Sequence, residues 1–165
     1  MPNNTLALAN KSQRWSFASY VTGFTDGEGT FQVSFSYRPK LKTHIEVRPS
    51  FSISQHKRSK EVLWKIKNYF WVGKIRFCKK DQNFKYEVRA IDDLEKKIIP
   101  HFQKFPLMTK KKDDFLIFVD ICKMVTQKLH KNPNLVKEII KRAYRMNESG
   151  KRKYSKEKLL SLVAR

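Results

Sequence analysis

Two carboxylates and two glycines stand together at Asp26-Gly27-Glu28-Gly29, a spacing suited to metal chemistry. Oxygen ligands suit hard divalent cations, and flanking glycines let the backbone turn so that a carboxylate points outward. An aspartate at a turn commonly accepts hydrogen bonds from backbone amides, so we expect a structural role for Asp26. Glu28, with the Gly27 carbonyl beside it, is the predicted ligand of Mg²⁺ or Mn²⁺, and no organic cofactor is expected.

Side chains that read base edges in the major groove recur at alternate positions of four apolar segments. Arg recognises guanine, Gln recognises adenine, and Ser or Thr suits either. The predicted DNA-reading residues are Gln32, Ser34, Ser36, Arg38, His44, Arg48, Ser50, Arg76 and Arg89. Glu46 and Glu87 lie on the same faces, where each either accepts from cytosine or pairs with a neighbouring arginine. Any half-exposed sheet has a polar face, so this pattern alone does not indicate DNA binding and needs a second, independent observation.

The composition supplies that observation, because it indicates a polyanionic partner. The chain has 36 Lys and Arg against 15 Asp and Glu, a formal net charge of +21, and such a charge repels itself unless a polyanion binds. An anionic membrane is disfavoured, because no basic cluster lies beside a long apolar helix and no apolar run approaches the roughly 20 residues that span a bilayer. We therefore expect double-stranded DNA as the partner and no membrane association.

The cysteines and histidines argue against a zinc site or a disulfide scaffold. Cys78 and Cys122 are far apart, and the four histidines show neither an HxxxH nor a cysteine-paired spacing. We expect an intracellular, reducing compartment, and the N-terminal residues carry no visible secretory or transit signal. Abundant Lys, Asn, Ile and Phe are typical of AT-rich organellar genes, so a chloroplast or mitochondrion is a candidate location.

Hydrophobic periodicity predicts the elements that position these residues. Helical spacing begins near Arg14 and ends at Asp26, and strict alternation then predicts a strand. A second alternating segment contains Pro49, which should mark a bulge or an edge. The further predicted elements are a helix at 59–70 capped by Ser59, strands at 74–79 and 84–91, a helix from Asp92 that is kinked or broken at Pro100, and helices beyond Pro106.

This order predicts an α+β fold, αββαββα, with a four-stranded antiparallel sheet and additional C-terminal helices. Helices would cover the apolar face of the sheet, and the polar face would be free to bind DNA. Residues 1–13 are expected to form a flexible N-terminal segment, and residues 14–165 a single domain.

Residues 21–29, VTGFTDGEG, resemble the LAGLIDADG motif of the homing endonucleases. Gly23, Asp26 and Gly29 match the motif outright, and Glu28 stands where the family carries its metal-binding acid. Three positions depart from the literal motif: Thr22, Thr25 and Gly27. The resemblance implies a DNA endonuclease that cuts both strands and leaves short 3′ overhangs.

The resemblance covers roughly 16–118 and includes the predicted order of elements. The segment from Ile99 to Lys111 is similar to the family segment that leads into a catalytic lysine. It implies that Lys111 or the neighbouring Lys110 lies near the scissile phosphate, where a cation stabilises developing charge. Gln55 resembles a family residue that orients solvent in the active site.

The motif occurs once, and single-motif members of the family act as homodimers on pseudo-palindromic sites. Gly23 and Gly27 are four residues apart and so lie on one helix face, where they permit close approach of a second helix. The predicted dimer interface consists of Val21, Gly23, Phe24 and Gly27. Pairing would bring two copies of Glu28 together, so that DNA phosphates complete the metal coordination.

Two other functions remain open on the same fold: an intron maturase that binds RNA as a splicing cofactor, and a DNA-binding regulator without catalysis. Glu28 and the lysine segment favour the nuclease over the regulator, although neither excludes RNA binding. A nuclease of the D…ExK type would need Asp81 with Glu95 and Lys97, and it is disfavoured because Glu95 lies in a helix-like stretch.

Overall fold

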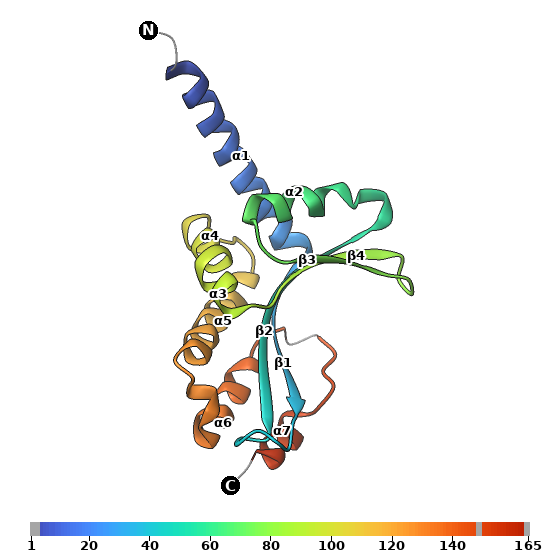
Figure 1. Cartoon of the computed structure of the whole chain (residues 1–165), viewed down its shortest axis with the longest axis vertical. Helices are drawn as coiled ribbons and strands as arrows, with labels where there is room; N and C mark the ends of the chain where they lie inside the picture. Colours follow the sequence, from blue (N-terminus) through green and yellow to red (C-terminus); the bar gives the residue numbers. More distant parts are fainter. Residues whose placement is uncertain (1–3, 148–149, 164–165) are drawn as a thin grey trace.

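A four-stranded antiparallel sheet, with strand order β1-β2-β4-β3, is covered by helices on one face (Figure 1). The computed structural model describes residues 4–147 and 150–163, with side chains from residue 16 onward. The strands are β1 (Gly29–Tyr37), β2 (Ile45–His56), β3 (Lys74–Cys78) and β4 (Asn83–Val88). The α-helices are α1 (Asn4–Glu28), α2 (Glu61–Phe70), α3 (Ile91–Asp93), α4 (Ile99–Lys104), α5 (Lys111–Thr126), α6 (Pro133–Ala143) and α7 (Lys156–Leu162). The predicted α+β class, with its αββαββα order and C-terminal helices, is therefore confirmed.

Alternate residues of β1 face opposite sides of the sheet, as predicted. Phe31, Val33 and Phe35 are buried and the polar residues between them are exposed or half-buried, whereas Tyr37 at the end of the strand is exposed. The antiparallel register pairs Gln32 with Ser50 and Ser34 with Arg48. Because directly paired residues point to the same face, the predicted polar face is continuous across the first two strands.

Helix α1 is longer at its N-terminal end than the sequence indicated. It begins at Asn4, about ten residues before the predicted start near Arg14, and it ends at Glu28, where β1 begins. The predicted flexible segment 1–13 is not tested, because residues 1–3 and all the side chains of this segment lie outside the described residues.

The junction between α1 and β1 requires glycine at position 29. A Cβ on Gly29 would lie 2.5 Å from Thr25 Cγ2 and 2.9 Å from the Thr25 carbonyl oxygen, so a larger residue would push the strand away from the helix. Thr25 is fully buried, and Val21 and Thr22 are buried on the same side of α1. The junction thereby fixes the place of Glu28 relative to both elements.

Aromatic side chains fill the space between the sheet and the helices. Phe31 of β1 packs against Phe51 of β2 and Phe102 of α4, with 5.2 Å between ring centroids in each pair, and against Phe118 of α5 at 5.4 Å. Complete burial of such a side chain contributes about 2 kcal/mol. The apolar face of the sheet is therefore packed against the helices.

Two prolines mark irregularities in the elements, as predicted. Pro49 lies opposite Val33, in the half of β2 that precedes the pairing with β4 from Phe51 onward, so it occupies an edge where a missing N–H is tolerated. Pro100 lies in the first turn of α4, directly after the π-helical segment η2 (Leu94–Ile98). Since proline clashes with the preceding turn of a regular helix, the π-helical turn lets the chain continue in a distorted helix.

The C-terminal helices have the apolar stripes that their sequences predict. The buried residues of α5 and α6 include Phe115, Phe118, Val119, Cys122, Val136, Ile139, Ile140 and Ala143. Ser155 accepts a hydrogen bond from the backbone N–H of Lys158 at 3.1 Å and so caps α7. Among the described residues, no helix has both the length and the apolar composition to cross a membrane.

Candidate functional site

Asp26 holds a distant segment of the chain to the end of α1. Its carboxylate accepts hydrogen bonds from the backbone N–H groups of Met108 (2.8 Å) and Thr109 (3.3 Å) and from the Thr109 hydroxyl (2.7 Å). Partial burial opposes ionisation, but these hydrogen bonds and the charge of Lys111 lower the pKa of Asp26 below its ordinary value. The structural role expected for Asp26 is confirmed, and the segment that it braces is the approach to α5.

Lys111 caps the same end of α1. Its ammonium group donates to the carbonyl oxygens of Thr25 (2.8 Å) and Asp26 (2.9 Å), which the last turn of a helix leaves without an intrahelical partner. Burial lowers the pKa of Lys111, and acidic groups that include Asp26 and Glu28 oppose this effect. Lys111 is therefore tied to the turn that presents Glu28, whereas Lys110 is exposed.

The contribution of Thr109 was missed at the level of sequence. Its hydroxyl donates to Asp26 and accepts from the backbone N–H of Lys111 at 3.2 Å, so it links the two residues that brace the end of α1. A threonine just before a helix is a recognisable signal, because Ser and Thr side chains often bond the first backbone N–H groups. Its partner Asp26 lies 83 residues away, beyond the reach of any local pattern.

Glu28 and Gly27 are exposed at the end of α1. Gln55 is half-buried on β2, two residues beyond Ile53, which pairs with Gly29, so it lies near the end of the sheet at which β1 begins. In the part of the chain that the structure describes, no three His, Cys, Asp or Glu side chains gather as metal ligands. One chain offers the Glu28 carboxylate and the Gly27 carbonyl, oxygen donors that suit a hard cation but are too few to complete its coordination.

The exposed side of α1 carries two of the glycines of the motif. Gly23 and Gly27 are exposed, and a Cβ built on either would meet nothing within 4 Å. Phe24 is half-buried and stacks on Tyr20, with 5.7 Å between ring centroids. Val21 is wrongly placed in the predicted dimer interface, because it is 0 % exposed in the single chain and has no surface left to bury against a partner.

Glu46 organises one group of the predicted DNA-reading residues. Its carboxylate pairs with the guanidinium groups of Arg38 and Arg48, both at 3.1 Å. Arg48 also donates to the Ser36 hydroxyl at 2.9 Å. Of the two roles left open for Glu46, the pairing with arginine is the one found in the free protein.

Glu87 organises a second group, across β3 and β4. It pairs with Arg89 (2.9 Å), Lys85 (3.3 Å) and Arg76 (3.6 Å). Partial burial opposes ionisation, but the charges of Lys85 and Arg89 lower the pKa of Glu87 below its ordinary value. The carboxylate is therefore ionised at neutral pH and holds three cations of the polar face in place.

The other predicted DNA-reading residues differ in accessibility. Gln32 is exposed, the hydroxyl of Ser34 donates to a backbone carbonyl of β2, and His44 packs edge-on against Tyr37. Ser50 is only 6 % exposed, so little of its side chain is accessible in this structure, and its base-reading role stays a prediction.

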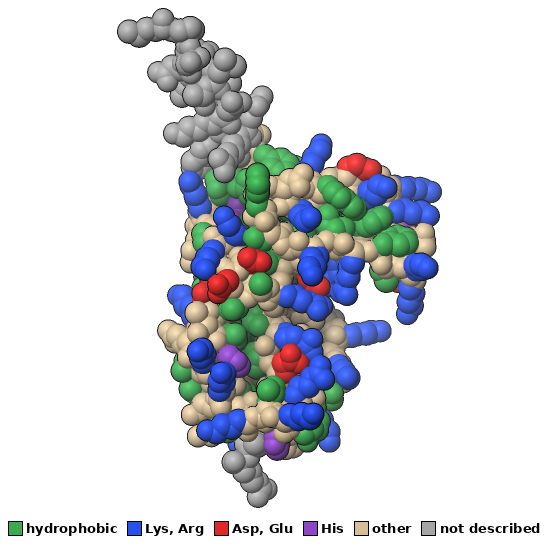
Figure 2. Space-filling view, in the orientation of Figure 1, with side chains coloured by type: hydrophobic (Ala, Val, Ile, Leu, Met, Phe, Trp, Pro, Cys, Tyr) green, Lys and Arg blue, Asp and Glu red, His purple; other side chains and the backbone are tan. Residues whose placement is uncertain are grey.

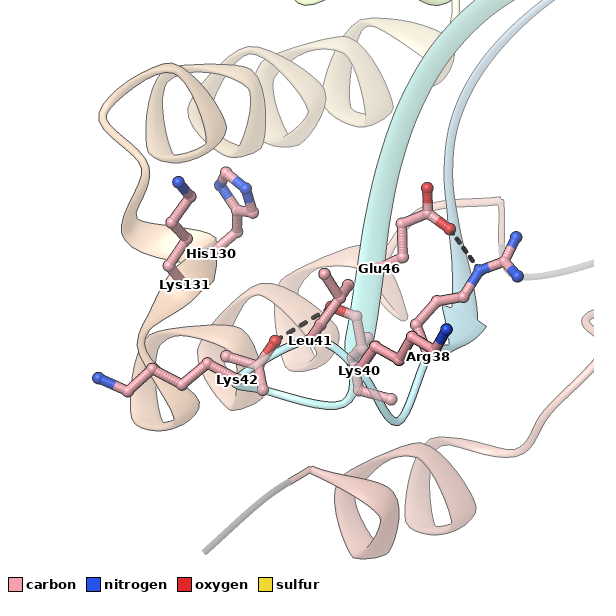
Figure 3. Close-up of a pocket in the computed structure, with 9 residues that line it drawn as sticks. Arg38, Lys40, Leu41, Lys42, Glu46, His130 and Lys131 are labelled. Carbon is pink, nitrogen blue, oxygen red and sulfur yellow. Dashed lines mark hydrogen bonds and ion pairs between the residues drawn. The ribbon is translucent and has the colours of Figure 1, made fainter.

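Basic side chains are spread over the surface and gather around the projecting β3–β4 hairpin (Figure 2). A hollow of about 660 Å³ lies where the turn between β1 and β2 approaches the segment η3 (Leu129–Lys131). Its basic lining residues are Arg38, Lys40, Lys42 and Lys131. Figure 3 shows the ammonium groups of Lys40 and Lys42 pointing in opposite directions, so they extend the basic surface and do not converge on one anion.

His101 joins three helices through its two ring nitrogens. Nε2 lies 3.2 Å from the Thr22 hydroxyl, which itself donates to the Phe105 carbonyl, and Nδ1 lies 3.1 Å from the Tyr69 hydroxyl. This pattern fits the neutral ring, with Nε2–H donating to Thr22 and Nδ1 accepting from Tyr69. Burial lowers the pKa of His101 to about 4, so it fixes α1, α2 and α4 without carrying charge at neutral pH.

A net charge of +21 and a sheet face that carries arginines are typical of nucleic-acid-binding proteins. A family model described as LAGLIDADG endonuclease matches residues 21–122, and the chain belongs to this family. The match begins at Val21 within α1 and ends at Cys122 within α5, so it includes Glu28 and the bracing residues Asp26, Thr109 and Lys111.

Relatives of known name and structure agree with this assignment. The chain is 32 % identical over 146 residues to "Probable intron-encoded endonuclease 2" of Neurospora crassa, covering 88 % of this chain and 32 % of that protein. The crystal structure of a homing endonuclease, I-TnaI, aligns with a TM-score of 0.77 at 33 % identity, covering 88 % of this chain and 94 % of the other. The archaeal homing endonuclease I-Vdi141I, complexed with DNA, aligns with a TM-score of 0.80 at 29 % identity, covering 88 % and 92 %. The chain thus spans about a third of the Neurospora relative but nearly all of the two solved chains.

Proposed function

We propose that this chain is a site-specific endonuclease that cuts both strands of DNA as a homodimer, leaving short 3′ overhangs. The observation that carries the proposal is the exposed Glu28 at the end of α1, in a turn held by Asp26 and Lys111. A catalytic carboxylate must be fixed in position yet open to substrate, and these contacts satisfy both conditions.

The proposed cofactor is Mg²⁺ or Mn²⁺, held by the Glu28 carboxylate and the Gly27 carbonyl of each subunit. Such an ion polarises the scissile phosphate, lowers the pKa of a water molecule and offsets charge on the leaving oxygen. Two subunits that meet along α1 would double the available donors, and DNA phosphates would supply more. A related structure, I-SmaMI bound to uncleaved DNA in the presence of calcium ions, supports a divalent metal in such a protein.

Lys111 and Gln55 are the proposed side chains that act beside the metal site. The ammonium group of Lys111 lies at the carbonyls of Thr25 and Asp26, from which it would stabilise negative charge on a phosphate placed next to Glu28. Gln55 would orient solvent through its amide. Lys110, exposed beside them, would anchor a neighbouring phosphate.

The polar face of the sheet is the proposed surface that reads double-stranded DNA. The arginines held by Glu46 and Glu87 present donors from β2 and β3 and from just beyond the ends of β1 and β4, and arginine recognises guanine through two hydrogen bonds. Gln32, Ser34, Ser36 and His44 complete the proposed reading set. The complex of I-Vdi141I with DNA supports DNA as the ligand.

Homodimer formation is proposed from the exposed side of α1. Glycine inside a helix costs about 1 kcal/mol relative to alanine, and the surroundings of Gly23 and Gly27 in one chain leave room for a side chain. Close approach of a second α1 along Gly23, Phe24 and Gly27 accounts for both glycines.

We further propose that residues 14–165 act as one domain, and that the chain is encoded by an intron of an organellar genome, as the name of its Neurospora relative supports in part.

The proposal is tested by incubating wild-type protein and the variant Glu28→Gln with Mg²⁺ and a plasmid library of random pseudo-palindromes, followed by sequencing of the ends. We expect discrete double-strand ends with short 3′ overhangs from the wild type and none from the variant. Glu61→Gln, which changes a carboxylate in the first turn of α2, is the matched control and should cut like wild type.

Chelation of the metal should abolish cutting while leaving salt-sensitive DNA binding intact. Tight binding to DNA or to structured RNA without any cut ends would overturn the nuclease proposal. The polar face would then serve a DNA-binding regulator in the first case and an RNA-binding splicing cofactor in the second.

A further inference from the structure

Trp71 combines strong exposure with an unfavourable backbone conformation. It follows directly on α2 with φ 61° and ψ 19°, in the left-handed region, and 87 % of its surface is exposed. This position at a helix end ordinarily favours glycine, and a bulky residue there carries a conformational cost. Because so little of the ring is packed within the chain, internal contacts do not offset that cost, and an external ligand is indicated.

Trp71 lines two neighbouring hollows. One, of about 660 Å³, is bounded by α1, the end of α2, and the η2–α4 segment, and the other, of about 440 Å³, lies against the last turn of α2. Four lysines line the two hollows: Lys67, Lys96, Lys97 and Lys104. No acidic side chain of the described residues lines either one. The surroundings of the indole ring are therefore basic.

One of these lysines, Lys96, forms an ion pair with an acidic residue but is still able to bind a phosphate. Lys96 pairs with Asp92 at 3.1 Å, and both side chains are more than 70 % exposed. A pair this exposed contributes little and is screened by salt, so a phosphate competes with it effectively. The basic character of the surface is therefore retained.

This surface is separate from the polar face of the sheet. Leu63, Ile66 and Phe70 form the buried side of α2, whereas Asn68 and Trp71 face solvent. In Figure 1 the end of α2 lies beside α1, in the layer of helices that covers the sheet. A duplex bound to the sheet would therefore leave Trp71 accessible.

We propose that Trp71 and the surrounding lysines bind an unpaired polynucleotide strand. One base stacks on the indole ring, and the phosphates on either side contact the lysines, which is how single strands are held without reading of their sequence. The inference goes beyond DNA cleavage, because it concerns a second surface and requires no metal. RNA and single-stranded DNA share this chemistry, and the experiment separates them.

The direct test uses the fluorescence of Trp71 itself. The chain has 3 tryptophans, so the double substitution Trp15→Phe and Trp64→Phe leaves Trp71 as the reporter. Titration with 15-nucleotide oligo(U) or oligo(dT) should quench its emission, because a stacked base quenches indole. The strand that binds more tightly, RNA or DNA, identifies the source of the ligand.

Affinity is measured in parallel by anisotropy of the labelled oligonucleotides. Trp71→Gly should weaken binding about tenfold, the loss expected for one base–aromatic stack, and glycine suits the left-handed backbone so the variant should fold. Lys97→Ala should reduce the slope of log affinity against log salt by about 0.7. Trp64→Ala and Lys123→Ala are the matched controls on exposed parts of α2 and α5 and should bind like wild type.

Three results would overturn the proposal. One is unchanged emission of Trp71 at oligonucleotide concentrations that saturate the anisotropy signal. Another is equal loss of affinity in Trp71→Gly and Trp64→Ala. The third is a shift of Trp71→Gly from dimer to monomer in sedimentation, which would make Trp71 a contact with a second copy of the chain. Binding of a 25-base-pair duplex should remain within twofold of wild type in Trp71→Gly, so failure here is distinguishable from failure of the nuclease proposal.

Discussion

Asp26 and Glu28 are two residues apart, yet their surroundings differ completely. Asp26 accepts three hydrogen bonds from Met108 and Thr109, whereas Glu28 is exposed. The two carboxylates therefore differ in what they contact. Asp26 fixes the turn, and Glu28 is exposed to solvent.

Asp26→Asn should destabilise the protein by about 1 kcal/mol at pH 7, because an amide cannot accept all of these hydrogen bonds. The folded-state pKa of Asp26 lies below its ordinary value. Its contribution is therefore present above about pH 4 and is lost as the pH falls through the folded-state pKa. Urea unfolding at pH 7 and pH 3 should show a difference between wild type and variant that shrinks in acid.

The control for this prediction is Asp92→Asn, which removes only an exposed ion pair with Lys96 and should change stability little. An equal difference between wild type and Asp26→Asn at both pH values would contradict the assignment of the ionised carboxylate as the bracing group.

Trp71→Gly should raise thermal stability, although it removes a large side chain. The left-handed conformation costs an L-residue about 1 kcal/mol, and glycine is free of that cost, while the exposed ring contributes little packing. For a chain of this size the melting temperature should rise by about 2–4 °C, measured by circular dichroism. A fall in melting temperature would show that the ring is packed in solution.

At the scale of elements, the strands could be predicted from the sequence, but the elements that pack over each residue could not. Apolar and polar residues alternate strictly in β1 and β2, and this repeat of two residues is typical of a strand with one buried face. The alternation therefore identified the polar face. Burial of Ser50 and Val21 depends on which elements cover them, information that no local pattern contains. Ser59 was predicted to cap α2, but it ends the 3₁₀ segment η1 (Lys57–Ser59), and α2 begins without a side-chain cap.

The residues of the candidate site that are adjacent in one motif could be predicted from the sequence. The contacts between residues far apart in the sequence could not. Glu28, Gly27 and Asp26 are adjacent, so their chemistry is visible in the sequence. The hydrogen bonds of Thr109 and Lys111 to the end of α1 join residues more than 80 positions apart. Only the folded chain brings them together, although a resemblance in the lysine segment had indicated Lys111 or the neighbouring Lys110.

The contact of three helices at His101 should make stability depend on pH. Its folded-state pKa of about 4 lies below the ordinary value near 6.5, so the stabilising effect is complete above pH 6.5 and is lost as the pH falls toward 4. The loss from this group should reach about 3 kcal/mol. Urea unfolding between pH 7 and pH 4 measures it.

In His101→Asn the pH dependence over this range should be much weaker, although the variant starts from a lower stability. His56→Asn, at an exposed position, should keep the full dependence of the wild type. Equal slopes in wild type and His101→Asn would assign the acid sensitivity to other groups.

At the scale of the whole molecule, the exposed side of α1 determines whether two chains can pair. Gly23→Leu should leave the single chain folded, because its surroundings have room for a side chain. In a close helix pair the added side chain would overpack the contact, costing about 3 kcal/mol, or ~100-fold in the dissociation constant. Sedimentation velocity should then show a monomer with an unchanged circular dichroism spectrum, and double-strand cutting should be lost.

Lys123→Leu, an equally apolar change on the exposed side of α5, is the control and should sediment like wild type. A Gly23→Leu protein that remains dimeric would mean that chains pair through another surface.

For a polar face that reads DNA as we propose, the two shared carboxylates have a consequence for how base preference changes over evolution or by engineering. Glu46 joins Arg38 to Arg48, and Glu87 joins Arg76, Lys85 and Arg89. Groups that share a charged partner do not contribute additively, so replacing one arginine changes the orientation and charge of the others. Base preference should therefore change in blocks, one block for each carboxylate, and single substitutions should show strong epistasis within a block and little between blocks.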